Sequence, residues 1–250
     1  MTTGVLIYCF DTPRFKYHKL AQRCVAQIRK YLKLEITVVT DFETFKCFDP
    51  MGMINYKLVE PTKNNHRFYR GKNVPWHNRE RSMAYEHSPY DITILMDCDY
   101  FVFSDHLLEM SQTDFDIMLH NRVSDITGKN MIEGVYESCL PLVWATVTLF
   151  KKNQNARAVF EMIKHVQEYY SHYRNLYRIK YTNYRNDYAF AIAMHQSGVG
   201  TYIPTAMSML ASDVDVIDTD DSTIVFSHKG QVNFIKDRDV HVMDKEWCDG

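Results

Sequence analysis

The stretch that decides the fold runs from Ile92 to Phe103 and reads ITILMDCDYFVF. Its first half is apolar and rich in β-branched residues, and the segment 89–91 (Pro-Tyr-Asp) marks a turn before it. A short apolar run of this kind predicts a strand that is buried on both faces, as in the interior of a mostly parallel sheet. The sequence therefore indicates an α/β fold centred on this strand.

Two aspartates, Asp97 and Asp99, follow the apolar run directly. On an extended chain their side chains point the same way, with Cα atoms about 6–7 Å apart. Two carboxylates set among apolar neighbours are costly to leave uncompensated, and a hard divalent cation satisfies both. We therefore expect Asp97 and Asp99 to hold Mg²⁺ or Mn²⁺ against substrate phosphates. The simpler alternative is that each aspartate caps a helix or starts a turn.

The composition is that of an ordinary globular protein, with 250 residues, 46% hydrophobic and 24% charged. This length suits a single α/β domain over 1–250. Residues 1–5 do not resemble a signal peptide, and no apolar run approaches the length of a membrane span. The six cysteines form no Cys-x-x-Cys pairs. This predicts reduced thiols in a cytoplasmic protein (host cytoplasm if viral), and neither disulfides nor a zinc site.

The chain opens with a β-α-β pattern, which predicts two parallel strands joined by a right-handed crossover helix. Ligands in such sheets bind beyond the carboxyl ends of the strands, here residues 8–11 and 40–41. Further along, the periodicity predicts strands at 55–59, 115–120 and 142–150, and helices at 76–86, at 155–170 and from 186. We expect polar loops at 61–75, 121–133 and 213–221.

Positive charge gathers in two stretches, although the net charge is only −2. Residues 63–81 hold six basic side chains and one acid, and 169–185 hold four basic side chains and no acid, interleaved with six tyrosines. Tyrosine faces stack on sugars and unpaired bases, and cations bind phosphates, so these stretches could receive DNA or a glycan. The alternatives are solvated surfaces and, for 169–185, a helix that buries every fourth residue (Tyr169, Tyr173, Tyr177, Tyr181).

Residues 90–102 resemble the Tyr-Asp-x5-Asp-x-Asp-hydrophobic segment of GT-A-fold glycosyltransferases, especially the glycogenin and bacterial galactosyltransferase-like group. The resemblance implies a GT-A-like (Rossmann-like) α/β fold with a mixed, mostly parallel sheet flanked by helices. It also implies metal-dependent transfer of a hexosyl or pentosyl group from a nucleotide diphosphate sugar, expected to be a UDP-sugar, to a hydroxyl. The segment 142–150 lacks the Asn-x-Gly motif of the family, which leaves the donor sugar open.

The same resemblance implies donor-binding roles for residues before the central strand. Tyr8 and Asp41 lie where the family holds the base and ribose, and Asp41 can equally be a turn or cap residue. Arg79 corresponds to the basic residue that meets the donor sugar or phosphate, which suits a guanidinium. The alternative for either arginine is an ion pair at the surface, which we expect for Arg81 more than for Arg79.

Later residues match the catalytic end of the family pattern. Asp187 stands at a helix start that faces the reacting sugar, as a base if the enzyme inverts or as an orienting group if it retains. Capping alone could also explain Asp187. His241 corresponds to the histidine that completes the metal site, with His228 as a competing choice, and Lys245 corresponds to the lysine on the diphosphate.

Several acceptors and functions fit this sequence. The acceptor could be hydroxymethylated cytosine in DNA, as for some phage enzymes, which requires base flipping in a duplex. It could also be a glycan or lipid precursor. A haloacid-dehalogenase-type phosphatase would use Asp97 and Asp99 with the late acidic pair Asp220-Asp221. A non-enzymatic nucleic-acid or carbohydrate binder is the third reading, and it leaves the two aspartates without a role.

Overall fold

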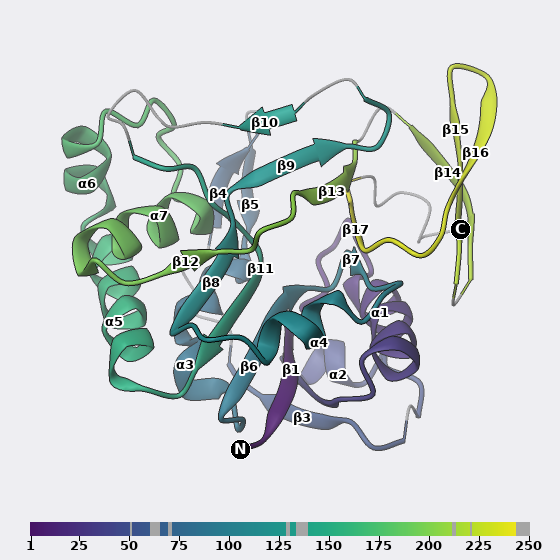
Figure 1. The fold of residues 1–250 in the computed structure, drawn as a ribbon, viewed down its shortest axis with the longest axis horizontal. Coiled ribbons are helices and arrows are strands. Elements are labelled where there is room, and N and C mark those ends of the chain that lie inside the picture. The colour runs from purple at the N-terminus through teal and green to yellow at the C-terminus, as the bar shows by residue number, and fades with distance from the viewer. Residues whose placement is uncertain are drawn as a thin grey trace.

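A seven-stranded sheet forms the centre of the computed structural model, in the strand order β12-β8-β11-β6-β1-β2-β3 (Figure 1). The structure describes residues 1–50, 52–60, 66–69, 72–128, 131–133, 140–211, 214–220 and 222–243. Strand β11 runs antiparallel to β6 and β8, and the other neighbours pair in parallel. The expected mixed, mostly parallel sheet is thereby confirmed. Its strands are β1 (Thr3–Tyr8), β2 (Glu35–Thr40), β3 (Asn55–Leu58), β6 (Ile92–Asp97), β8 (Ile117–His120), β11 (Trp144–Lys151) and β12 (Thr201–Tyr202).

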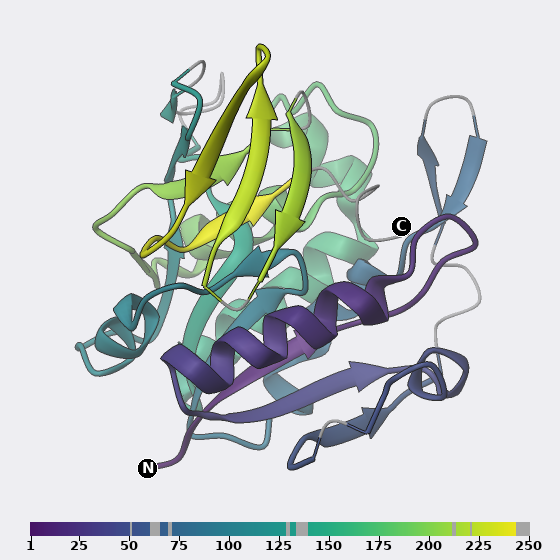
Figure 2. The same ribbon diagram turned by 90° about the vertical axis from the view of Figure 1, so that its right-hand side faces the viewer.

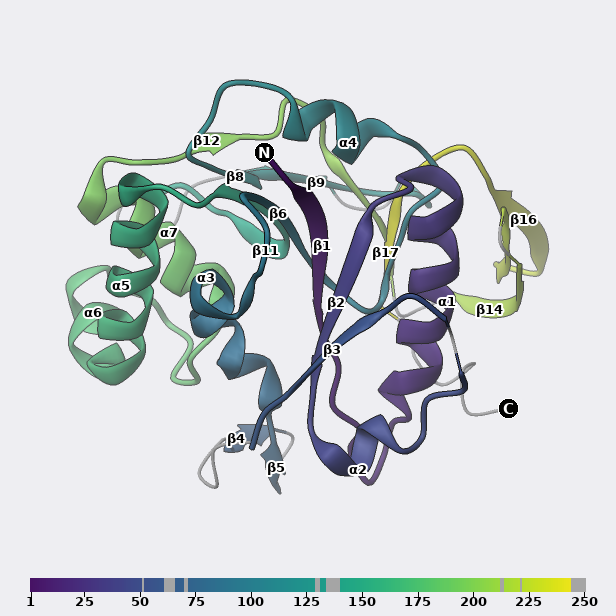
Figure 3. The same cartoon turned by 90° about the horizontal axis from the view of Figure 1, so that it is seen from below.

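Helices cover both faces of this sheet (Figure 3). Because side chains alternate along a strand, β1 sends Val5 and Ile7 to one face and Leu6 and Tyr8 to the other. The first face packs on α1 (Tyr17–Tyr31), and the second packs on α5 (Gln154–Glu168) and α7 (Asn186–Ser197). Burial on both sides explains why the central strands read as continuous apolar runs. The shorter helices are α2 (Phe42–Phe45), α3 (Ala84–His87), α4 (His106–Ser111) and α6 (Tyr170–Leu176).

Three smaller sheets surround the main one. A five-stranded sheet has the order β10-β9-β13-β17-β7. A three-stranded sheet, β14-β15-β16, and the hairpin β4-β5 project from the body of the molecule (Figure 2). Among the described residues, the helices lack the combination of length and apolarity that crossing a bilayer requires. The strands are β4 (His66–Tyr69), β5 (Lys72–Pro75), β7 (Tyr100–Phe101), β9 (Arg122–Asp125), β10 (Met131–Glu133), β13 (Met207–Leu210), β14 (Asp215–Thr219), β15 (Ile224–His228), β16 (Gln231–Ile235) and β17 (Val240–Val242).

The structure corrects several local expectations. The loops expected at 61–75, 121–133 and 213–221 contain strands, whose polar residues hide the period-two pattern and whose partners are other short strands. The helix expected at 76–86 is a 3₁₀ helix, η1 (His77–Met83), followed by the single turn α3.

His120, at the end of β8, is a buried histidine with one backbone partner. It is 2% exposed, and its Nδ1 lies 3.1 Å from the carbonyl oxygen of Thr205. Because a carbonyl only accepts, Nδ1 carries the proton. Burial disfavours the charged ring and lowers the pKa of His120 to about 4, against the opposing effect of the Thr205 bond. The folded protein therefore holds this imidazole neutral at pH values where an unfolded chain would protonate it.

We predict that His120 makes the protein acid-sensitive between about pH 6.5 and pH 4. In this window the unfolded chain protonates this ring and the folded one does not, so the contribution of His120 to the free energy of unfolding falls with falling pH, by up to about 3 kcal/mol. Urea denaturation at a series of pH values measures this slope. His120→Asn, which keeps an N–H donor for Thr205, should flatten it. The exposed His172→Asn is the control, and an equal effect of both variants would contradict the assignment.

Candidate metal and donor site

Three potential metal ligands meet at the end of the central strand. Asp97 ends β6, Asp99 immediately precedes β7, and His241 lies in β17. Strand β17 pairs antiparallel with β7, and the Val242 N–H donates to the Asp99 carbonyl at 3.0 Å. One ligand atom from each of the three side chains lies within 4.8 Å of the others. Pairing between residues more than 140 positions apart therefore assembles the cluster.

The donor set of this cluster fits a divalent cation. Asp99 and His241 are 4% and 7% exposed, so their polar atoms are largely shielded from water. His241 Nε2 lies 3.4 Å from Asp99 Oδ1, which is longer than a good hydrogen bond. Ligand atoms around Mg²⁺ or a similar ion are about 3–4 Å apart, and carboxylate oxygens are the preferred ligands. The residues present could thus close around such an ion with small movements.

A buried arginine holds one of the carboxylates. Arg81, only 1% exposed, donates from Nη1 to Asp97 Oδ1 and from Nη2 to the Ala145 carbonyl. The Asn78 amide adds a longer bond to the same Asp97 oxygen at 3.3 Å. The expectation of a surface ion pair for Arg81 was wrong, because a guanidinium on η1 reaches the end of β6 beneath the surface. The polar end of β6 could have suggested this partner, but burial was not visible in the sequence.

Arg79, the arginine that we assigned to the donor, lies elsewhere in the structure. Its Nη2 donates to the Gln167 carbonyl of α5 at 3.4 Å, and its guanidinium stands over the Tyr184 ring at 5.8 Å. The structure brings Arg81 to Asp97 and leaves Arg79 against α5. A role for Arg79 in donor binding stays a prediction.

The two residues expected at the nucleotide rim have other partners. Tyr8 is buried, and its hydroxyl shares a 2.9 Å hydrogen bond with His87 Nδ1. Burial raises the pKa of Tyr8 well above its ordinary value and lowers the pKa of His87. Asp41 is the N-cap of α2 and accepts from the Thr44 N–H at 2.7 Å. The capping alternative therefore describes Asp41, and contact of either residue with a nucleotide stays a prediction.

Asp187 sits in the first turn of α7 but does not cap that helix. Its Oδ1 accepts from the Ala145 N–H at 2.9 Å, and its Oδ2 pairs with Arg185 at 2.8 Å. The Ala145 carbonyl accepts a hydrogen bond from Arg81, so this one residue of β11 connects Asp187 to the Arg81–Asp97 pair. Ala145 lies where β11 shifts its register against β8, between Trp144 and Thr148.

Asn186 is a site residue that the sequence reasoning missed. It is 6% exposed, and its amide donates to the Asn78 carbonyl at 2.9 Å. Because Asn78 also donates to Asp97, this bond links the start of α7 to the end of β6 through η1. An asparagine beside Asp187 at a helix start was the available signal, but it predicts a cap and not a contact between elements.

The structure separates the two candidate histidines. His241 joins Asp97 and Asp99, whereas His228 belongs to β15 in the projecting three-stranded sheet. Lys245, the lysine expected on the diphosphate, lies outside the described residues. Its role stays a prediction.

The tyrosine-rich stretch 169–185 is mostly exposed, but three of its six tyrosines are buried. Tyr170, Tyr173 and Tyr177 are buried, whereas Tyr169 and Tyr181 are 49% and 62% exposed. The expected spacing of four is confirmed for Tyr173 and Tyr177 and wrong for Tyr169 and Tyr181, because α6 starts at Tyr170 and ends at Leu176. In the basic stretch 63–81 the structure does not describe the side chains of 63–75. What remains at the surface of 169–185 is a smaller aromatic area than the sequence indicated.

Two sequence comparisons found no match: neither a protein-family model nor a curated protein resembles this chain. Solved structures do. An active-site mutant of LgtC superposes with a TM-score of 0.53 at 14% identity, over 80% of this chain and 72% of that one. The galactosyltransferase LgtC in complex with donor and acceptor sugar analogues gives 0.51 at 14% identity over the same shares. Mouse xyloside xylosyltransferase 1 gives 0.51 at 10%, over 81% and 85%.

These likenesses define a class of fold. LgtC and the mouse protein are glycosyltransferases by name, and the arrangement that they share with this chain is the GT-A fold. At 14% identity and below, the likeness extends to the fold alone. The fold class expected from residues 90–102 is thereby confirmed.

We predict that the buried Arg81 is required for stability in a way that the neighbouring Arg79 is not. Arg81→Lys keeps the charge but cannot bond Asp97 and Ala145 together, so the free energy of unfolding should fall by about 1.5–3 kcal/mol. Urea denaturation measures the loss. Arg79→Lys is the matched control and should lose less than about 1 kcal/mol. Equal losses of unfolding free energy in the two variants would show that the two hydrogen bonds of the buried Arg81 guanidinium are not the stabilising feature.

Proposed function

We propose that this protein is a metal-dependent glycosyltransferase that moves a sugar from a nucleotide diphosphate sugar, expected to be a UDP-sugar, to a hydroxyl. The observation that carries the proposal is the cluster of Asp97, Asp99 and His241 at the carboxyl end of a central parallel strand. Ligands in open α/β sheets bind at this edge. The GT-A fold of the chain adds support, since the similar solved structures are glycosyltransferases.

In this proposal the cluster holds Mn²⁺ or Mg²⁺ through two carboxylates and one imidazole. When bound, such an ion acts as a Lewis acid that neutralises the charge gathering on the leaving diphosphate. The protein contributes the positions of the ligands. Arg81 fixes the Asp97 carboxylate from beneath, and pairing of β17 with β7 sets His241 opposite Tyr100. Rigid supports of this kind orient ligands before the substrate arrives.

We assign Asp187 a positioning role. Both of its oxygens already have partners, the Ala145 N–H and the Arg185 guanidinium. A carboxylate whose oxygens are engaged in this way is poorly placed to take the proton of an acceptor hydroxyl. Through Ala145 it also reaches the residue that holds Arg81. Asp187 therefore orients the floor of the site in this proposal, which leaves the acceptor hydroxyl to be activated by another group or by the leaving diphosphate.

The acceptor in this proposal is a hydroxyl, and DNA that contains hydroxymethylated cytosine stands among the acceptors to be tested. The exposed Tyr169 and Tyr181 belong to a stretch with four basic side chains, and their rings could stack a base or a sugar. Simple glycans and lipid precursors are the other acceptors to be tested beside DNA. The logarithm of the binding constant for DNA should fall linearly with the logarithm of the salt concentration, and that for a neutral glycan should not.

The phosphatase alternative receives no support from the geometry. Asp220, the described member of its late acidic pair, is exposed and accepts from Ser222 in a turn. The acidic clusters found among the described residues do not include it with Asp97 and Asp99. The partner of Asp97 and Asp99 is instead a histidine, which suits metal coordination.

We predict that a nucleotide diphosphate sugar raises the melting temperature only when Mn²⁺ or Mg²⁺ is present. A ligand at 100 times its Kd adds about 2.7 kcal/mol to the free energy of unfolding, which is about 5–10 °C for a chain of this size. Thermal unfolding with a panel of UDP-sugars, with and without the ion, measures the shift. Asp99→Ala should abolish it, and Asp114→Ala, which removes an exposed carboxylate, should not.

Either of two results would sink this proposal. One is a panel without any metal-dependent shift, and the other is an equal shift in Asp99→Ala. Hydrolysis of a phosphate monoester by the wild type but not by Asp97→Asn would move the phosphatase ahead. Binding of DNA or glycan that is unchanged in Asp97→Ala, without any donor shift, would favour the non-enzymatic binder.

We predict that Asp187→Asn lowers turnover without weakening donor binding. Asparagine keeps an oxygen for the Ala145 N–H but loses the ion pair with Arg185, so the side chain is held by one bond instead of two and orients the site less well. Release of the nucleotide diphosphate should slow by about 10–100-fold. Asp187→Ala, which also loses the bond to Ala145, should in addition lower the melting temperature. An Asp187→Asn protein with unchanged turnover would refute a role for this carboxylate.

A further inference from the structure

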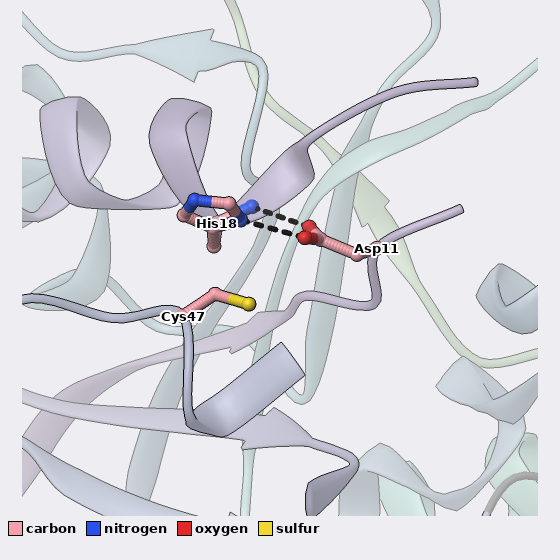
Figure 4. Close-up of side chains that lie close together, drawn as sticks. All are labelled: Asp11, His18 and Cys47. Atoms are coloured by element: carbon pink, nitrogen blue, oxygen red, sulfur yellow. Dashed lines mark hydrogen bonds and ion pairs between the residues drawn. The ribbon is translucent and has the colours of Figure 1, made fainter. Parts of the chain in front are cut away.

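A second cluster of ligand-type side chains lies outside the site described above. It combines Asp11 from the segment after β1, His18 from the first turn of α1 and Cys47 from the segment after α2 (Figure 4). One carboxylate oxygen, one ring nitrogen and the sulfur lie within 4.8 Å of one another. These three atoms are of types that ligate transition metals.

Asp11 and His18 form a firm, shielded pair. Asp11 Oδ2 lies 2.6 Å from His18 Nδ1, and Asp11 Oδ1 accepts from the His18 backbone N–H at 3.0 Å. The two side chains are 13% and 12% exposed. Taken alone, this pair would be a structural contact that closes the turn before α1. The Cys47 thiol beside it makes the three side chains a possible set of metal ligands.

Cys47 differs from the other described cysteines. Cys9, Cys24 and Cys98 are buried, and burial raises the pKa of the Cys9 and Cys24 thiols. Cys47 is exposed, and its sulfur has only a weak contact with the Glu43 carbonyl at 3.5 Å. A metal can therefore reach this sulfur from solvent.

Backbone contacts hold the two halves of the cluster together. The Asp11 N–H donates to Thr44 Oγ1 at 2.9 Å, and the Thr44 N–H donates to the Asp41 cap at 2.7 Å. The Cys47 N–H in turn donates to the Thr44 carbonyl at 3.0 Å. Thr44 thus joins the segment that carries Asp11 to the segment that carries Cys47. The ligands approach each other through bonds that are present without an ion.

We propose that Asp11, His18 and Cys47 form a binding site for Zn²⁺, with water or a ligand group in the fourth position. Thiolate and imidazole select Zn²⁺ over Mg²⁺ or Mn²⁺, and three protein ligands leave one tetrahedral position open. Zn–S, Zn–N and Zn–O bonds of about 2.0–2.3 Å place ligand atoms about 3.3–3.6 Å apart. The exposed Cys47 side chain supplies most of the inward movement. Binding releases the Cys47 thiol proton. It also replaces the 2.6 Å hydrogen bond between Asp11 Oδ2 and His18 Nδ1, so these two atoms move apart and the proton between them leaves that position.

Such an ion would cross-link the segments that follow β1 and β2 at the ligand-binding edge of the sheet. Asp11 follows β1 and Cys47 follows β2 and α2, so the ion would fix the relative position of these two segments without any disulfide. The site is independent of the proposed glycosyltransfer, since it shares no residue with Asp97, Asp99 and His241. Spacing rules for zinc look for Cys-x-x-Cys pairs, and therefore overlook a mixed site that folding assembles.

The test uses Co²⁺ as a spectroscopic probe and Zn²⁺ as its competitor. The background protein is Asp99→Ala, Cys139→Ser, Cys248→Ser, which removes the other metal cluster and the thiols outside the described residues. We expect one equivalent of Co²⁺ to give tetrahedral bands and a thiolate charge-transfer band, both displaced by one equivalent of Zn²⁺. Adding Cys47→Ser should remove the charge-transfer band and weaken Zn²⁺ binding by at least about tenfold.

His18→Asn is the matched ligand variant, because its amide can still donate to Asp11 and keep the turn closed. It should also weaken Zn²⁺ by at least about tenfold, with the metal-free melting temperature close to that of the background protein. A charge-transfer band that persists in Cys47→Ser would overturn the proposal, as would the absence of any such band in the background protein. Zn²⁺ binding that disappears only with Asp99→Ala in an otherwise wild-type chain would assign the ion to the other cluster.

Discussion

The buried guanidinium of Arg81 is the constraint on which the site depends. A charge that is 1% exposed must have partners, because an unpaired ion in the interior costs several kcal/mol. Its two partners are Asp97, at the end of β6, and the Ala145 carbonyl of β11. Three elements must therefore meet at one point before this charge is satisfied. The tight 3₁₀ winding of η1 is consistent with this demand, since η1 carries Arg81 down to the end of β6.

The reversed direction of β11 makes this meeting possible. In a sheet where the other strands run in parallel, the carboxyl ends of β1, β2 and β6 share one edge. An antiparallel strand brings its first residues to that same edge, and Ala145 and Thr146 are the second and third residues of β11. Ala145 can thus bond Asp187 and Arg81 at once, and Thr146 Oγ1 lies 3.5 Å from His241 Nδ1.

The sequence predicted the parts of the molecule that local pattern controls. The buried strand 92–97, the β-α-β opening and the paired aspartates follow from apolar runs and spacing. The family pattern also suggested His241, although only strand pairing between β17 and β7 could place it beside Asp99. Arg81 could not be predicted as buried, because its burial depends on Asp97 and Ala145 together. Short polar strands such as β9 could not be predicted either, because they also depend on distant partners. Strand β9 pairs with β13, which lies more than 80 residues away in the sequence.

Charge balance explains why this edge of the sheet should collect a cation and then an anion. Asp97 and Asp99 bring two carboxylates into a shielded corner, where Arg81 pairs with Asp97 and His241 Nε2 lies 3.4 Å from Asp99 Oδ1. A divalent ion held by these side chains would add two positive charges to the corner. A diphosphate would then be attracted more strongly than without the ion, so binding of the metal and of the anionic ligand should be cooperative.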